Sequence, residues 1–221
     1  MKLVIFDVDG TLSDSQAHIA HAMTLAFESV GLAPPPREAV LSIVGLSLPQ
    51  AIARLAPELG ADVQARIVEG YKQSYFTHRA ASPAPLYAGA RKCLQKLAAR
   101  DDLLLGVATG KSRRGLDALI AHHGLEGMFV TRQVADNHPS KPHPSMIEAA
   151  LSETGVARER AVMIGDTTFD IEMARAARVA ALGVSWGYHP VPDLRAAGAT
   201  RILTGFADLE AAVDDILEEV A

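Results

Sequence analysis

The sequence predicts an α/β fold in which a doubly wound parallel β-sheet is interrupted by an all-helical insertion. Residues 3–8 form a short, almost continuous apolar run that ends in acidic residues and a glycine, as a buried parallel strand does. Beyond residue 85, short apolar segments alternate with segments whose apolar residues recur at three and four positions. Parallel strands need crossover helices between them, so this alternation predicts a parallel sheet covered by helices on both faces.

The helical insertion is expected directly after the first strand. Apolar residues at helical spacing indicate its first helix, namely Ile19, Ala22, Met23, Ala26, Phe27 and Val30. Residues 34–36 are consecutive prolines that mark a turn, and further helices are expected to begin at Arg37, Leu48 and Ala61. We therefore expect a core domain made of residues 1–13 and 84–221 and a helical cap domain made of residues 14–83.

The elements of the core follow in alternation after the insertion. Strands are expected at residues 103–108, 128–131, 161–164, 179–184 and 201–203. Helices are expected to begin at Gly89, Ser112, Pro144, Thr168 and Phe206. In sheets of this kind, ligands bind beyond the carboxyl ends of the strands, so a site is expected in the loops that follow them.

Charge and composition argue against several classes of function. The formal net charge is −5 and no run of lysine and arginine occurs, whereas nucleic acids and acidic membranes require a concentrated basic surface. The apolar start ends at Asp7, too early for the core of a signal peptide, and no stretch is long and apolar enough to span a bilayer. The single cysteine, Cys93, cannot form an internal disulfide, and we expect it to be structural. We expect a cytoplasmic protein with a small-molecule partner, no nucleic-acid or membrane partner, and an undetermined oligomeric state.

Polar side chains of a distinctive kind follow several of the predicted strands. They are Asp7 and Asp9 after the first strand, Thr109 and Gly110 after the second, Lys141 in a later loop, and Asp166 and Asp170 after the fourth. Each type alone is common, because acids often cap helices, a Thr-Gly pair often forms a turn, and a loop lysine is usually solvated. Independent caps, however, have no reason to follow this order at successive strand ends. In a parallel sheet these side chains converge at one edge.

Phosphoryl transfer explains why these residue types belong together. A phosphate monoester repels an attacking carboxylate unless cations and hydrogen-bond donors neutralise its oxygens. Mg²⁺ takes oxygen ligands and is typically shared between one or two carboxylates and a substrate phosphate. A lysine ammonium supplies a second positive charge, and a threonine hydroxyl with neighbouring backbone N–H groups supplies directed donors.

The sequence resembles the haloacid dehalogenase superfamily in four segments that follow the order of its motifs. The segments are Asp7-Val8-Asp9-Gly10-Thr11-Leu12-Ser13-Asp14-Ser15, Ala108-Thr109-Gly110-Lys111-Ser112, Lys141-Pro142 and Gly165-Asp166-Thr167-Thr168-Phe169-Asp170. The resemblance covers nearly the whole chain, and the first motif is highly specific. It implies a Rossmann-like core and a C1-type helical cap that closes over the active site.

The same resemblance assigns a role to each motif residue. It implies that Asp7 is the nucleophile that becomes phosphorylated, and that Asp9 protonates the leaving group and then activates water. Thr109, Gly110 and Lys141 would bind the phosphate. The implied magnesium ligands are Asp7, the Asp9 carbonyl and Asp166, with Asp170 in support. The expected activity is magnesium-dependent hydrolysis of a small phosphorylated metabolite through an aspartyl-phosphate.

Within this superfamily, the residues favour the phosphatases. Its dehalogenases lack the second acid of the first motif, which is Asp9 here. Its phosphonate hydrolases use a cap lysine, and Lys72 is expected to lie far from the substrate-facing loop 44–48. Its sugar phosphomutases hold a second phosphate in the cap, and nothing indicates such a site here. The pattern is most similar to the phosphoglycolate phosphatase-like group, including residues 183–188.

The substrate and several alternatives stay open at this point. Phosphoglycolate is one candidate substrate, but the cap loop is apolar, and Arg54 or Arg37 would have to swing in to select a second anionic group. A phosphomutase and a phosphonate hydrolase are the alternatives within the superfamily. A phospho-acceptor signalling module shares the acidic pocket, although its chain has no helical cap after the first strand. A binding protein without activity would be expected to lack some of the motif residues.

Two pairs of histidines lie close together in the sequence. His18 and His21 lie three residues apart on one predicted helix, and His138 and His143 flank Lys141. Zinc sites combine histidine with cysteine or carboxylate ligands, and no such residue stands at a compatible spacing from either pair. We therefore expect no zinc site at these histidines.

Overall fold

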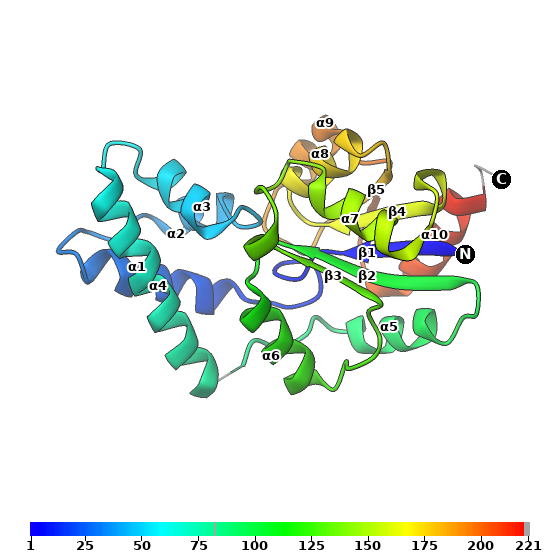
Figure 1. Cartoon of the computed structure of the whole chain (residues 1–221), viewed down its shortest axis with the longest axis horizontal. Coiled ribbons are helices and arrows are strands. Elements are labelled where there is room, and N and C mark those ends of the chain that lie inside the picture. The colour runs from blue at the N-terminus through cyan, green and yellow to red at the C-terminus, as the bar shows by residue number, and fades with distance from the viewer. Residues whose placement is uncertain (82, 219–221) are drawn as a thin grey trace.

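The part of the chain that the structure describes, residues 1–81 and 83–218, forms a six-stranded sheet in this computed structural model (Figure 1). The strands are β1 (Lys2–Phe6), β2 (Leu103–Thr109), β3 (Thr131–Val134), β4 (Ala161–Gly165), β5 (Ala180–Val184) and β6 (Arg201–Leu203). Their order is β3-β2-β1-β4-β5-β6, and each neighbouring pair is parallel. The chain moves outward from β1 in one direction and then in the other, so the predicted doubly wound sheet is confirmed.

Helices cover both faces of this sheet. On one face lie α5 (Ala90–Ala98), α6 (Arg113–His123) and α10 (Leu209–Glu218), and on the other lie α7 (Ser145–Thr154), α8 (Thr168–Ala176) and α9 (Val191–Ala197) (Figure 1). In β1, Val4 and Phe6 belong to the hydrophobic cluster on the face covered by α5, α6 and α10. Leu3 and Ile5 belong to the cluster on the opposite face. A strand buried on both faces has no polar side, which is why its sequence is an unbroken apolar run.

Between β1 and α5, the described residues form four helices that make a separate layer beside the carboxyl ends of the strands (Figure 1). They are α1 (Gln16–Glu28), α2 (Arg37–Ser42), α3 (Leu48–Leu55) and α4 (Ala61–Ala81). Their apolar faces share a hydrophobic cluster of their own, to which α8 contributes Phe169. The predicted helical insertion is thus present. Its exact boundaries stay a prediction, and Ser82 beside the second boundary lies outside the described residues.

Three elements differ from the sequence-based expectation. The third strand begins at Thr131, because residues 125–128 form a turn closed by the Met128 N–H donating to the Leu125 carbonyl. Helix α9 was not expected, since it has only seven residues and lies between Pro190 and Gly198. The last helix, α10, begins at Leu209, after a short 3₁₀ turn at Phe206–Asp208. Among the described helices, none is both long enough and apolar enough to cross a membrane.

Candidate active site

The carboxyl ends of β1, β2 and β4 lie side by side, because β1 pairs with β2 on one edge and with β4 on the other. Asp7 directly follows β1, and its backbone N–H donates to the carbonyl of Ile164 at 2.9 Å. Thr109 is the last residue of β2, and Asp166 directly follows β4. Three segments that are far apart in the sequence therefore bring their polar residues to one edge of the sheet, as predicted.

Three carboxylates form the centre of this site. Asp7, Asp166 and Asp170 are buried, and each offers an oxygen within 4.8 Å of the others. Burial, followed by the charges of Asp170 and Asp7, raises the pKa of Asp166 well above its usual range. Burial is also the largest cause that raises the pKa of Asp7, to about 6, although the Lys141 charge opposes it. A cation is the simplest way to offset this concentration of negative charge.

Lys141 supplies one positive charge to the cluster. Its ammonium is wholly buried and donates to Asp7 Oδ1 at 2.9 Å and to Asp170 Oδ1 at 2.6 Å. Burial lowers the pKa of Lys141, but the charges of Asp170 and Asp7 outweigh burial and raise it, so the lysine stays charged. Lys141 thereby orients the Asp7 carboxylate through one oxygen. The other oxygen, Oδ2, is buried and has no hydrogen-bond partner among the described residues.

Asp166 and Asp170 are held by their own local contacts. Asp166 Oδ1 accepts a hydrogen bond from the Thr11 hydroxyl at 2.8 Å, and Oδ2 accepts one from the Tyr188 N–H at 2.9 Å. Asp170 is the third residue of α8 and forms a reciprocal cap with Thr167, whose N–H and hydroxyl donate to Asp170 Oδ2. Reciprocal capping satisfies two free donors at the start of a helix. Both carboxylates are therefore oriented before any ligand binds.

A glycine is required beside Asp166. Gly10 has a φ of +89°, a conformation that L-residues with a side chain rarely adopt. A Cβ atom at this position would collide with Asp166 Oδ2. The glycine of the first motif thus permits the close approach of the β1 loop to the carboxylate after β4.

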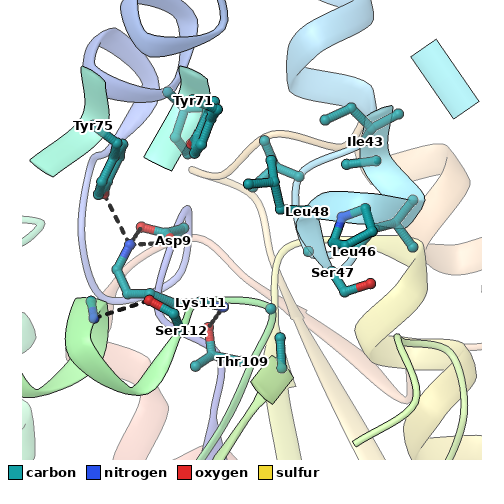
Figure 2. Close-up of a pocket in the computed structure, with 18 of the residues that line it drawn as sticks. Asp9, Ile43, Leu46, Ser47, Leu48, Tyr71, Tyr75, Thr109, Lys111 and Ser112 are labelled. Carbon is teal, nitrogen blue, oxygen red and sulfur yellow. Dashed lines mark hydrogen bonds and ion pairs between the residues drawn. The ribbon is translucent and has the colours of Figure 1, made fainter. Parts of the chain in front are cut away.

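Asp9 is engaged by a second lysine, for which we predicted no role. Lys111, which follows β2, donates from Nζ to Asp9 Oδ1 at 2.8 Å, to Asp9 Oδ2 at 2.7 Å and to the Tyr75 hydroxyl of α4 at 3.0 Å (Figure 2). Ser15 also donates to Asp9 Oδ1, at 2.5 Å. Burial lowers the pKa of Lys111, but the Asp9 charge and Tyr75 outweigh burial and raise it. In the sequence, the signal that Lys111 belongs to the site is its position in the second motif.

A pocket of about 350 Å³ opens between this edge of the sheet and the helical layer. From the core it is lined by Asp7, Asp9, Thr109, Gly110, Lys111 and Ser112. From the helical layer it is lined by the loop 43–48 and by Tyr71 and Tyr75 of α4 (Figure 2). Lys72 of α4 also borders it. Lys141, Asp166 and Asp170 are not among the lining residues. Lys72 was expected to lie far from the loop 44–48, and both border the same pocket.

The helical layer touches the core at several points around the pocket. A Cβ atom on Gly110 would stand 2.6 Å from the Gly45 carbonyl oxygen, so the loop 44–48 packs directly against the backbone of Gly110. The Ser47 N–H donates to the Ser140 hydroxyl at 2.7 Å. His189 accepts a hydrogen bond from the Thr168 N–H at Nδ1 and lies 3.2 Å from the Ser42 carbonyl at Nε2. The loop and α4 therefore cover the carboxyl ends of the strands.

The acidic cluster fits a divalent metal ion. Its donors are carboxylate oxygens, which Mg²⁺ prefers, and one oxygen of Asp7, Oδ2, has no hydrogen-bond partner among the described residues. Both ring nitrogens of His138 contact neighbouring side chains, Ser145 at 2.8 Å and Gln133 at 2.9 Å. The predicted magnesium ligands were Asp7, the Asp9 carbonyl and Asp166, with Asp170 in support. The cluster contains Asp7, Asp166 and Asp170 but not Asp9, and the assignment of ligands stays a prediction.

Comparison with known proteins decides the family. Residues 4–184 match the family described as haloacid dehalogenase-like hydrolase. The chain belongs to this family. It is 33% identical to the protein named "Probable phosphatase IndB" of Dickeya dadantii, over 98% of this chain and 95% of that protein. It is also 33% identical to a phosphoglycolate phosphatase of Rhodospirillum rubrum, over 94% of this chain and 89% of that protein.

Solved structures show the same fold. A hydrolase from Pseudomonas syringae superposes with a TM-score of 0.87 at 24% identity, covering 98% of this chain and 99% of that one. A haloacid dehalogenase-like hydrolase from Streptococcus pneumoniae superposes with a TM-score of 0.82 at 25% identity, covering 96% and 98%. The predicted Rossmann-like core with a helical insertion is confirmed. So is the prediction that the chain is a phosphatase of the haloacid dehalogenase-like family.

Proposed function

We propose that the enzyme is a magnesium-dependent phosphatase that hydrolyses a small phosphate monoester through an aspartyl-phosphate on Asp7. The observation that supports this most directly is the arrangement of the Asp7 carboxylate. Lys141 holds one of its oxygens, and the other has no hydrogen-bond partner among the described residues. Asp7 also lines the pocket. A carboxylate that is oriented through one oxygen and has the second available is suited to attack a bound phosphoryl group.

Two displacements complete the reaction. In the first, Asp7 Oδ2 attacks phosphorus, the bond from phosphorus to the ester oxygen breaks, and Asp9 gives a proton to the leaving oxygen. In the second, Asp9 takes a proton from water, the water oxygen attacks the same phosphorus, and phosphate leaves Asp7. Splitting one displacement into two lowers the barrier, and a positioned acid and base typically contributes about 10²- to 10⁴-fold.

Residues around Asp7 would hold the phosphoryl group and the metal ion. Thr109 and Gly110 offer a hydroxyl and a backbone N–H at the end of β2, and Lys141 adds a positive charge. The residues that would hold Mg²⁺ are Asp7, Asp166 and the Asp9 carbonyl, with Asp170 in support. When bound, Mg²⁺ supplies positive charge that offsets the charges of the carboxylates and of the phosphoryl group.

Phosphoglycolate is a candidate substrate. The relative from Rhodospirillum rubrum bears the name phosphoglycolate phosphatase. The pocket, at about 350 Å³, is near the lower end of the range of about 300–1,000 Å³ for small-molecule sites, which suits a small metabolite. A cytoplasmic location is part of this proposal. A phosphomutase, a phosphonate hydrolase and a phospho-acceptor module are the alternatives.

The test is phosphate release from a panel of small phosphate esters and phosphonates, with Mg²⁺ or with a chelator. We expect release that requires Mg²⁺ and is lost in Asp7→Asn. Asp14→Asn is a matched control, because Asp14 lies in the same loop but not in the carboxylate cluster. Normal turnover by Asp7→Asn would disprove the mechanism, and release from a phosphonate alone would favour the phosphonate hydrolase.

The lifetime of the phosphoenzyme separates hydrolysis from signalling. After a pulse of labelled substrate and an acid quench, the phosphatase is expected to carry label that decays as fast as phosphate is released. A label that persists for minutes without phosphate release would favour the phospho-acceptor module. A label that moves to a sugar phosphate would favour the phosphomutase.

A further inference from the structure

We propose that Lys111 determines substrate specificity by binding a second, carboxylate group of the substrate, and that it exchanges Asp9 for this carboxylate when the substrate binds. The inference rests on the proposed phosphatase function and assigns a residue to the part of the substrate that does not react. It concerns the place where the core and α4 meet at the pocket. Figure 2 shows Lys111 between Asp9 and Tyr75, across the pocket from Leu46 and Leu48.

Lys111 is a buried cation that faces a binding pocket. Its side chain is 6% exposed, and its ammonium is bound by the two Asp9 oxygens and by the Tyr75 hydroxyl. The Tyr75 ring also lies 5.1 Å from Nζ and stacks on Tyr71 at 5.6 Å. A buried ammonium needs an anionic partner, because an unpaired charge away from water is costly. A neutral ligand would therefore leave the Lys111–Asp9 pair in place.

The ion pair between Lys111 and Asp9 conflicts with the proposed role of Asp9. Both carboxylate oxygens of Asp9 bind Lys111, so neither is available to reach the ester oxygen of a substrate. A substrate that brings its own carboxylate to Lys111 replaces one anionic partner with another. Asp9 is then released, while Tyr75 still accepts a hydrogen bond from the ammonium. Recognition of the second anion and release of Asp9 thus become a single event.

The other cations near the pocket are less suited to this task. Lys141 is occupied by Asp7 and Asp170. Lys72 lines the pocket, but its side chain is 53% exposed, and water weakens the pairing of such a charge. Arg54 and Arg37 do not line the pocket and have other partners: Arg54 lies over the Phe169 ring, and Arg37 donates a hydrogen bond to Gln16.

The experiment compares esters in pairs. Phosphoglycolate and 2-phospholactate are each measured beside the ester in which a hydroxymethyl group replaces the carboxylate. We expect the wild type to prefer the acid of each pair. In Lys111→Met, this ratio of kcat/KM values should fall by about 10- to 100-fold, the effect of one charge-assisted hydrogen bond. Lys72→Met, the matched control at the pocket rim, should keep the ratio within about twofold, as exposed charges contribute little.

A second variant tests the inference even if Lys111→Met does not fold. Tyr75→Phe keeps the Lys111–Asp9 pair and removes only the hydroxyl, and it should raise KM for the acid of each pair more than for its neutral counterpart. Equal losses for both members of each pair, in both variants, would show that Lys111 only supports Asp9 and would overturn the inference. The inference would also be overturned if the wild type did not prefer the acid of each pair, or if Lys72→Met lost this preference. No release from any ester would instead overturn the proposed function, and this inference with it.

Discussion

Replacing Asp7 by asparagine should stabilise the metal-free protein at neutral pH while it removes the proposed nucleophile. The Asp7 side chain is 1% exposed. Burial is the largest cause that raises its pKa from 3.8 to about 6, and the attraction of Lys141 does not compensate. The ionised carboxylate is therefore less stable in the folded protein than in the unfolded chain, where water surrounds it.

The size of this effect follows from the two pKa values. A change from 3.8 to about 6, at about 1.36 kcal/mol per pKa unit, corresponds to about 3 kcal/mol of unfolding free energy. Because the folded-state pKa is raised, the cost is absent below pH 3.8, grows as the pH rises through about 6, and is constant above that. The asparagine side chain has nearly the same shape, carries no charge and can still accept a hydrogen bond from Lys141. About 3 kcal/mol is therefore the upper bound of the gain.

Urea denaturation in the presence of a chelator measures this difference. At pH 8, Asp7→Asn should be more stable than the wild type by up to about 3 kcal/mol, and at pH 5 by about half as much. Saturating Mg²⁺ should stabilise the wild type more than the variant, since the variant lacks one proposed ligand. Asp14→Asn serves as the control for loss of an acid in the same loop outside the carboxylate cluster.

Two results would refute the reasoning. In the first, Asp7→Asn is less stable than the wild type at pH 8 without metal, which would mean that the ion pair with Lys141 outweighs burial. In the second, the variant has the same advantage at pH 5 and at pH 8. The gain would then come from packing rather than from removal of a buried charge.

Three further substitutions test the geometry of the site. Gly110→Ala should lower kcat/KM by about 10- to 100-fold, because its methyl group would displace the loop at Gly45; a smaller loss than tenfold contradicts this. Thr11→Ala should raise the Mg²⁺ concentration for half-maximal activity by about tenfold, because Asp166 loses a hydrogen bond that orients it; an unchanged Mg²⁺ dependence contradicts this. Lys141→Met should lower the unfolding free energy by about 3–5 kcal/mol in urea without metal, because two buried carboxylates lose their partner; full stability contradicts this.

Much of the fold could be predicted from local patterns. The apolar run of β1 and the alternation after residue 85 predicted the parallel sheet, because a strand buried on both faces is apolar throughout. The four helices of the insertion were also predicted. Helix α9 was missed because seven residues do not establish a helical period, and the start of β3 was misplaced because apolar residues 128–130 lie before the strand.

The central site residues could be predicted for a related reason. Asp7, Thr109 and Asp166 each stand at the end of a strand, and the topology of a parallel sheet brings these ends together. Their roles in catalysis stay predictions until the variants are measured. That Lys72 borders the pocket was not predicted, since a position along a helix does not show which residues of another segment it faces.

The sequence by itself determined the family, the parallel sheet and the meeting of the acidic residues at one edge, because these depend on strand order and on motifs of adjacent residues. Only the tertiary structure decided which side chains bind one another. Lys111 lies 102 residues from Asp9 and 36 from Tyr75, and nothing in the local sequence of any of the three indicates their contact. That contact depends on how α4 packs over the end of β2. The packing of whole elements, rather than a local pattern, therefore places a buried cation in the wall of the pocket.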